Sequence, residues 1–449
     1  MRRPGSLRLQ ASASRFQWRR LEYAVLGRPV APGEDPVRAH RRAMVAGCGL
    51  ALGVGAVMAA TTMVRPVPGD SPLVMSRQSG ALFVRVGERL RPVTDLVSAE
   101  LILGGPAAPR VVDDTALRGI VRGPVLGIPG APRAVGELIP PVDQRWAVCD
   151  GAERSTSVGV TGWESLADLG PGAGVLVSAA HGDAMTYLLY DGRRARVDPA
   201  DPVTARTLHL DGHRPRPVSS TLLSVIPEVP AIGPPRITGV GQPSGVAGFA
   251  VGSVVRTVRA GSEEFYVALR EGFQRVGRLT ADLIRFADPA ATTDITSVSP
   301  DVVAGAALVD TLPVATYPDV VPTLLGDDSV GVCATWRSGT AGIAVGPVGT
   351  DGSSTVALAA ADGDGPNVDA VAIPPGHSID VTAGTSGRYL LSDTGVLFPV
   401  RDSAAADALG LGRDPAAVPW AFLAALPAGA ELSRESALAG RDVLDGAAP

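Results

Sequence analysis

The stretch Tyr187–Val197, YLLYDGRRARV, recurs in three variants along this 449-residue chain, and the repetition decides the fold. Each copy begins with an aromatic residue in a β-like run, passes a Gly or Asp-Gly turn, and reaches a Val ten or eleven positions later. Alternating runs around such a turn predict a β-hairpin in every copy. The other copies are Phe83–Val93 (FVRVGERLRPV), Tyr266–Val276 (YVALREGFQRV) and Tyr389–Val400 (YLLSDTGVLFPV).

Working outward, Ala and Leu at helical spacing predict a helix after each hairpin. These helices are expected at Asp95–Leu103, Pro202–Leu210, Leu279–Phe286 and Asp402–Leu411. A second short apolar helix ending in Pro is expected at Leu138–Pro140, Leu222–Pro227, Ala307–Pro313 and Trp420–Pro427. A hairpin with its helices cannot bury its own apolar face, so the four units should pack on one another or on a shared centre.

The cysteines divide the chain in the same way as the repeats. Cys48 lies inside an apolar run, whereas Cys149 and Cys333 each follow an apolar stretch and have a Trp nearby. Because both would lie outside the cytoplasm, we predict a Cys149–Cys333 disulfide, with two free thiols as the alternative. Two hairpins and one cysteine fall in each half, so the chain looks duplicated.

The predicted fold class is α+β. A single N-terminal transmembrane helix precedes a periplasmic domain in which four small hairpin-plus-helix repeats surround a central β-rich domain with quasi-two-fold symmetry. Alternating patches at Gly174–Ala179 and Thr355–Leu358 are assigned to that central domain. The expected parts are a leader (1–42), the transmembrane helix (43–64), repeat 1 (76–140), the first central half (141–180), repeat 2 (181–230), a linker (231–252), repeat 3 (253–325), the second central half (326–378), repeat 4 (379–427) and a flexible tail (428–449).

The membrane segment is Ala43–Val64, AMVAGCGLALGVGAVMAATTMV, which holds 22 uncharged residues. At about 1.5 Å per residue a helix of this length crosses a hydrocarbon core of roughly 30 Å. His40, Arg41 and Arg42 precede it, so the positive-inside rule places the N-terminus in the cytoplasm. The alternatives are a signal peptide cleaved near Ala60 and a buried core helix.

Charge supports a membrane protein rather than a nucleic-acid-binding one. The net charge is −5, yet residues 1–42 carry +7 and residues 43–64 carry none, which leaves −12 for the remainder. A nucleic-acid-binding protein would have a basic folded domain, so we expect no nucleic acid partner.

The basic leader contains a predicted amphipathic helix, Ser14–Leu26, with Trp18, Leu21 and Val25 on one face. It is a candidate for docking on anionic lipid or on a cytoplasmic partner, and the arginines alone would also serve as a topology signal. The candidate docking residues are Phe16, Trp18, Arg19, Arg20 and Leu21.

Long ordered matches over nearly the whole chain resemble EccB, the single-pass membrane core component of type VII (ESX) secretion systems of actinobacteria. They include the arginine-rich leader with Arg19-Arg20-Leu21-Glu22 and the element Asp35-Pro36-Val37-Arg38. They continue through Ala81-Leu82-Phe83-Val84-Arg85-Val86-Gly87, Leu101-Ile102-Leu103-Gly104 and the run from Arg122 to Pro132, RGPVLGIPGAP.

The resemblance implies a structural subunit in the cytoplasmic membrane, with the C-terminal domain periplasmic. Its implied partners are the EccC motor ATPase, EccD, EccE and the mycosin protease, and its implied assembly is a homodimer through the periplasmic repeats within a larger oligomer. Its implied role is the export of small helical substrates.

Some EccB proteins carry an ATPase label, so nucleotide hydrolysis is the alternative function. The chain contains no lysine, which excludes a Walker A loop, and the glycine loop Gly239–Gly245 has no GK[ST] ending. We expect no catalytic, cofactor or metal site. His209–His213 is interpreted as a turn rather than a zinc site, and Asp362–Asn367 as a turn rather than a calcium loop. A third hypothesis is a membrane-anchored cell-wall receptor, although aromatic residues are only 4% of the chain.

Overall fold

The computed structural model describes residues 5–27, 36–63, 71–118, 122–151, 154–182, 185–288, 295–326, 330–348, 355–384 and 387–441. Two compact units result, one formed mainly by the N-terminal helices and the other by nearly all residues from Ser71 onward. The first contains α1 (Gly5–Val25) and α2 (Pro36–Met63). Helix α1 starts nine residues before the predicted Ser14, because residues 6–13 contain no Pro or Gly that would interrupt a helix.

Helix α2 spans 28 residues and contains the predicted membrane segment apart from Val64, which lies outside the described residues. Large apolar side chains along it are exposed, among them Val45, Leu50 and Leu52 at 69, 73 and 75%. Over the described residues, no helix meets the combination of length and apolar character that a membrane crossing needs.

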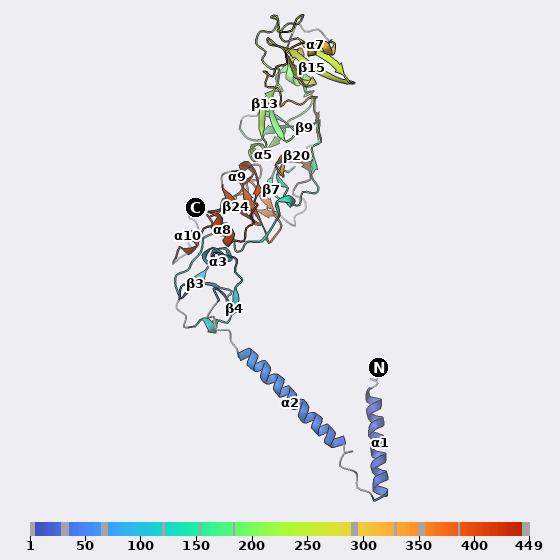
Figure 1. The fold of residues 1–449 in the computed structure, drawn as a ribbon, viewed down its shortest axis with the longest axis vertical. Helices are drawn as coiled ribbons and strands as arrows, with labels where there is room; N and C mark the ends of the chain where they lie inside the picture. The colour runs from blue at the N-terminus through green and yellow to red at the C-terminus, as the bar shows by residue number, and fades with distance from the viewer. Residues whose placement is uncertain are drawn as a thin grey trace. The chain divides into compact units, whose positions relative to one another are not determined.

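The larger unit mixes helices with five sheets, which confirms the α+β class (Figure 1). Four of the sheets share one arrangement of strands. When four strands of each sheet are numbered in chain order, they lie side by side as third, second, first and fourth. Adjacent strands among the first three are antiparallel, and the fourth is parallel to the first. The second and third strands are the predicted hairpins, and all four hairpins are confirmed. Of the flanking first and fourth strands, the sequence predicted only the alternating patch Gly174–Ala179, and it assigned that patch to the central domain.

The strands of these four sheets have the following bounds. The first sheet contains β1 (Leu73–Ser76), β2 (Leu82–Val86), β3 (Arg89–Val93) and β4 (Arg110–Val112). The second contains β9 (Ala173–Ala179), β10 (Thr186–Tyr190), β11 (Arg193–Val197), β12 (Arg216–Val218) and β13 (Glu228–Ile232). The third contains β14 (Val254–Arg259), β15 (Ser262–Ala268), β16 (Phe273–Val276) and β17 (Thr296–Ser297). The fourth contains β23 (His377–Thr382), β24 (Arg388–Ser392), β25 (Leu397–Val400) and β26 (Ala416–Ala417).

A helix follows each hairpin, as predicted: α3 (Leu96–Leu103), α4 (Pro202–Thr207), α6 (Arg278–Ala287) and α8 (Ser403–Ala408). Three of them begin in the same way, with an aspartate whose carboxylate accepts from the backbone amide three residues on. These N-caps are Asp95, Asp201 and Asp402. The corresponding residue before α6 is Gly277, which has no side chain to cap the helix.

Among the described residues, a second α-helix follows three of the hairpins, as α5 (Ser220–Val225), α7 (Pro300–Ala304) and α9 (Trp420–Ala424). The helices predicted at Leu138–Pro140 and Ala307–Pro313 do not form, because backbone groups in both segments are hydrogen-bonded to strands instead. Residues Glu137–Leu138 form β5, which pairs with β23, and the amide of Phe273 donates to the carbonyl of Ala307 at 2.8 Å. Helix α7 lies just upstream of the latter segment.

The fifth sheet is central and draws strands from both halves of the chain, in the order β21-β22-β7-β6-β19-β20-β8. Thr355–Ala357 joins it as predicted. Gly174–Ala179 does not, because it lies within β9 and pairs with β10 of the second sheet, with Leu176 opposite Leu188. The strands are β6 (Trp146–Asp150), β7 (Thr156–Gly159), β8 (Ala167–Asp168), β19 (Gly331–Arg337), β20 (Thr340–Gly346), β21 (Thr355–Ala357) and β22 (Ala370–Ala372).

Two segments, one predicted to be a linker and the other a flexible tail, contain packed residues. In the expected linker 231–252, Val246 and Val251 are buried and a bridge joins Pro243 to Ala250. In the expected tail, residues 428–441 contain α10 (Arg434–Leu438), which packs on α3. Leu432 and Ala437 are fully buried there, so the apolar residues of this segment complete a core rather than remain in solvent.

Candidate functional site: the disulfide-bridged centre

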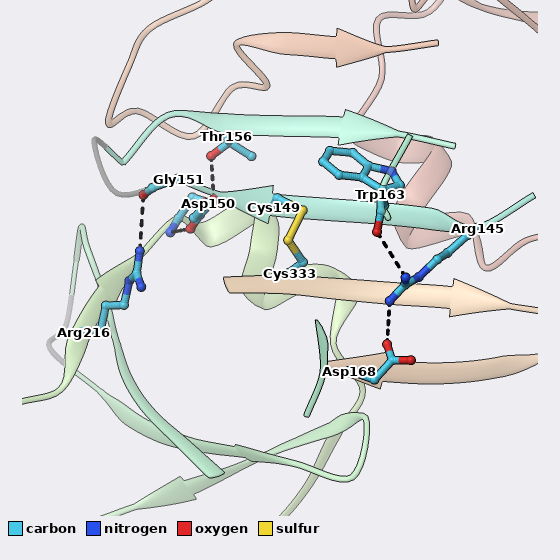
Figure 2. The surroundings of a disulfide bond; sticks show 10 residues. Arg145, Cys149, Asp150, Gly151, Thr156, Trp163, Asp168, Arg216 and Cys333 are labelled. Carbon is cyan, nitrogen blue, oxygen red and sulfur yellow. Dashed lines mark hydrogen bonds and ion pairs between the residues drawn. A yellow bond between two sulfur atoms is a disulfide. The ribbon is translucent and has the colours of Figure 1, made fainter. Parts of the chain in front are cut away.

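The disulfide between Cys149 and Cys333 is present and confirms the predicted pairing (Figure 2). Cys149 lies on β6 and Cys333 directly opposite on the antiparallel strand β19, with their Cα atoms 4.0 Å apart. Both cysteines are fully buried, packed with Trp163 and Leu166. The bond therefore joins the two halves of the chain inside the central sheet.

A buried carboxylate follows the disulfide in sequence. Asp150 is 2% exposed, and its oxygens accept from the backbone amide of Ser219 (2.6 Å), the Ser219 hydroxyl (2.9 Å) and the Thr156 hydroxyl (2.9 Å). Burial raises the pKa of the Asp150 carboxyl, and these hydrogen bonds together with the nearby Arg216 charge oppose that rise. Ser219 is the N-cap of α5, so Asp150 fixes the start of that helix to the central sheet.

Arg216 makes a second connection between these sheets. From β12 of the second sheet, its guanidinium donates to the carbonyl oxygen of Gly151 at 3.4 Å (Figure 2). It also donates to the carbonyl oxygen of Val330. On the other side of the disulfide, Arg145 donates to the carbonyl of Trp163 (3.3 Å) and to the carboxylate of Asp168 (2.6 Å). The sequence pattern did not single out Asp150, Arg216 or Ser219, and the one available signal was a charged residue directly after a cysteine.

The two halves also exchange strands around this centre. β5, which follows the first sheet in sequence, pairs with β23 of the fourth sheet. β18 (Thr323–Leu324), which follows the third sheet, pairs with β9 of the second. Neither half completes its sheets alone. The exchanged strands and the disulfide together hold the two halves of the chain in one relative arrangement.

The candidate docking residues lie on α1, far in sequence from this centre. Trp18 and Leu21 are 74 and 60% exposed, Arg19 and Arg20 are also exposed, and Phe16 is half-buried. Val25, on the same face as Trp18 and Leu21, is 84% exposed. The helix therefore presents an apolar stripe beside arginines.

The other motifs form turns. Within Gly239–Gly245, Gly239 and Gly241 have φ of 85° and 80°, and the next element is the strand β14 rather than a helix. In Asp362–Asn367, the Asp362 carboxylate accepts from the amide of Asn367. His209 has a φ of 53° and lies just after α4, with its side chain exposed.

Comparison with known proteins identifies the class. A protein-family model described as "Type VII secretion system ESX-1, transport TM domain B" matches residues 4–445. The "ESX-5 secretion system ATPase EccB5" of Mycobacterium tuberculosis is 31% identical, over 98% of this chain and 94% of the relative. The "ESX-3 secretion system ATPase EccB3" of Mycolicibacterium smegmatis is 34% identical, over 97% and 91%.

Solved structures agree with these relatives. A chain of "Structure of an intact ESX-5 inner membrane complex, Composite C3 model" superposes with a TM-score of 0.72 at 28% identity, over 98% of this chain and 97% of that one. "Structure of EccB3 dimer from the ESX-3 core complex" gives 0.71 at 30%, over 82% and 100%. The fold is that of a component of type VII secretion systems. The chain belongs to the EccB family.

Proposed function

We propose that this chain is the structural membrane-core subunit of a type VII (ESX) secretion machine that exports small helical substrates. The observation that carries this proposal is the interlocked body, in which two halves exchange strands and share one buried disulfide. Such a body resists being pulled apart, because each half supplies strands that the other needs. A subunit that holds other proteins in fixed relative positions needs a rigid body of this kind.

In this proposal, residues 43–64 anchor the chain with its N-terminus in the cytoplasm and the remainder outside. The exposed apolar side chains of α2 and the +7 charge of residues 1–42 support this topology. The four hairpin units then form a quasi-two-fold outer domain, in which β1, β9, β13, β23 and the C-terminal segment lie partly or wholly outside the predicted repeat bounds. Digestion of spheroplasts from outside should remove the outer domain and leave a short N-terminal fragment.

The proposed partners are an EccC-type ATPase, EccD and EccE at the membrane, a mycosin protease outside, and a second copy of this chain. Relatives solved as an ESX-5 inner membrane complex and as an EccB3 dimer support both kinds of assembly. The apolar stripe and arginines of α1 support a cytoplasmic docking role for Phe16, Trp18, Arg19, Arg20 and Leu21.

Affinity purification from membranes in mild detergent, followed by mass spectrometry, tests the assembly. The wild-type chain should retain an EccC-type motor. A variant with Trp18→Ala and Leu21→Ala should lose it, because the apolar stripe is removed, whereas Gln17→Ala on the same exposed helix should retain it. Recovery of the wild-type chain with cell-wall material and no secretion subunit would reject the proposal in favour of a wall receptor.

ATP hydrolysis is the second candidate, and the names of the two relatives, which include the word ATPase, favour it. Against it, the chain has no lysine and the loop Gly239–Gly245 leads into a strand, so no helix N-terminus follows to hold phosphates. We expect the purified chain, freed of any motor subunit, to release no phosphate from ATP above a buffer blank. Turnover that scales with the amount of this chain would establish the enzyme instead.

A further inference from the structure

Positive charge in the outer part of the chain is concentrated in the first sheet. Residues 71–135 hold eight arginines against five acids, whereas residues 136–449 hold 21 arginines against 36 acids. Two of those five acids, Asp95 and Glu100, are buried, so the surface of the first sheet is more basic than its sequence. Residues 71–135 therefore carry a net positive charge, whereas residues 136–449 carry a net negative charge.

Three of these arginines, Arg89, Arg110 and Arg122, lie at one end of the first sheet, which we name the proximal end because the chain arrives there from α2. The amide of Arg85 donates to the carbonyl of Pro72 (2.9 Å), which places this row of the sheet beside the incoming chain. Arg89 opens β3 opposite Val86, the last residue of β2. Arg110 opens β4, which runs parallel to β1 and therefore starts at the same end.

Arg122 completes the group from outside the sheet. It bridges to Leu90, the second residue of β3, and its guanidinium carbon lies 5.6 Å from the centre of the Phe83 ring. That stacking on an aromatic face holds the guanidinium in place while leaving its edge in solvent. Arg89, Arg110 and Arg122 are all exposed.

At the opposite end of the sheet, an arginine forms a salt bridge with an acidic side chain. Arg77, just after β1, pairs with Asp113 at 3.3 Å. For Arg89, Arg110 and Arg122, in contrast, the described part of the chain supplies no acidic group within salt-bridge distance. Glu88 is the one exposed acid in the turn between β2 and β3.

We propose that Arg89, Arg110 and Arg122, the proximal arginines, bind the phosphate groups of anionic phospholipids in the outer leaflet of the membrane. Guanidinium groups match phosphate oxygens, and an anionic surface attracts exposed cations over about one Debye length. Nine residues, 64–72, lie between Met63, the end of α2, and Leu73 in β1, so the two Cα atoms are ten steps apart, a reach of about 35 Å at most. The inference rests on the anchor of the proposed function and adds a lipid surface that would set the first sheet against the bilayer.

Hydrogen exchange on the full chain in nanodiscs tests it. Amides in the turn between β2 and β3 should exchange several-fold more slowly in discs of phosphatidylcholine and phosphatidylglycerol in equal parts than in discs of phosphatidylcholine alone. The protection should weaken at high salt. It should disappear in a variant with Arg89→Gln, Arg110→Gln and Arg122→Gln, and it should remain in Arg77→Gln at the opposite end.

The arms of the experiment separate the alternatives. Equal exchange in both kinds of disc, or unchanged protection in the triple variant, overturns the proposal. Protection of the detergent-solubilised chain by inorganic phosphate to the same degree indicates a free-anion site and also overturns it, as does protection seen only in membranes that retain other secretion subunits. A chain that fails to enter the discs refutes the anchor as well. Formation of the Cys149–Cys333 disulfide in each variant shows that it has folded.

Discussion

The first and fourth sheets share a core in a way that the second and third do not. Buried residues of both the first and the fourth sheet, such as Val84 and Phe398, belong to one apolar cluster, and α3 contacts both α8 and α10 (Figure 1). The cluster around the second sheet draws Leu279 and Leu283 from α6, while the third sheet keeps separate clusters around Phe265 and Phe273.

The difference shows that one strand order supports two degrees of coupling. Where facing elements send large side chains into one cluster, the sheets should lose structure together. Where only a helix projects into the neighbour, the sheet keeps its own core and should open by itself. The four experiments below test this contrast, from the largest expected effect to the smallest.

Two phenylalanines test the contrast directly. Phe398→Ala and Phe273→Ala should each cost about 3–5 kcal/mol, since both rings are buried, at 2 and 0% exposure. Hydrogen exchange should then rise in the first and fourth sheets together for Phe398→Ala, and in the third sheet alone for Phe273→Ala. Exchange spreading equally through all four sheets in both variants would contradict the proposed difference in coupling.

The disulfide connects the two halves of the chain. One half contains the first and second sheets and the other contains the third and fourth, so each half supplies one sheet to each of the two pairs compared above. Replacing both cysteines, Cys149→Ala with Cys333→Ala, should destabilise the chain by about 2–4 kcal/mol, because a link across 184 positions no longer restricts the unfolded chain. Denaturant titration of the full chain in detergent measures the loss. Wild-type protein under a thiol reductant is the control, and a variant as stable as oxidised wild type would show that strand exchange alone holds the centre.

The helix after the hairpin of the third sheet, α6, differs from the other three because its N-cap is a glycine, Gly277. Aspartate caps α3, α4 and α8, yet Gly277→Asp should destabilise by about 1–3 kcal/mol, because a Cβ there would lie 2.8 Å from the Cα of Asp319. In the wild type, the amide of Leu279 donates instead to the carbonyl of Asp319 at 3.0 Å. Thermal unfolding measures the effect, with Asp402→Gly as the reciprocal change, and a stabilised Gly277→Asp variant would refute this reason.

Asp150 gives the smallest expected effect, seen as a pH dependence. Burial raises its pKa in the folded state, so the folded chain holds the proton more tightly than the unfolded chain does. Stability should therefore fall as the pH rises from about 4, the unfolded value, through the raised folded value. Asp150→Asn should flatten part of this slope, at a cost of about 1–2 kcal/mol for the weakened hydrogen bonds at acidic pH.

Asp201 provides the matched control for Asp150. Its pKa is lowered, mainly by the hydrogen bond from the Thr204 side chain, so its contribution to stability is lost as the pH falls through that lowered value. Asp201→Asn should therefore leave the slope above pH 4 unchanged. A pH profile of Asp150→Asn that coincides with the wild type would show that Asp150 titrates normally in the folded chain.

Local pattern was enough for the elements that depend on neighbouring residues. The four hairpins follow from aromatic and Val residues around Gly turns, and Asp95 and Asp402 mark helix starts because a cap acts within three residues. The duplicated order of hairpins and cysteines also sufficed to pair Cys149 with Cys333.

Tertiary structure decided what depends on distant partners. Gly174–Ala179 alternates as well as any strand of the central sheet, and only its pairing with β10 assigns it to the second sheet. Glu137–Leu138 and residues 307–309 pair with distant backbones because these offered hydrogen bonds, and residues 428–441 became ordered because α3 left apolar surface to cover. Sequence spacing encodes turns and caps, but a strand's sheet and a buried Asp150 are fixed by residues far along the chain, whose positions no local pattern specifies.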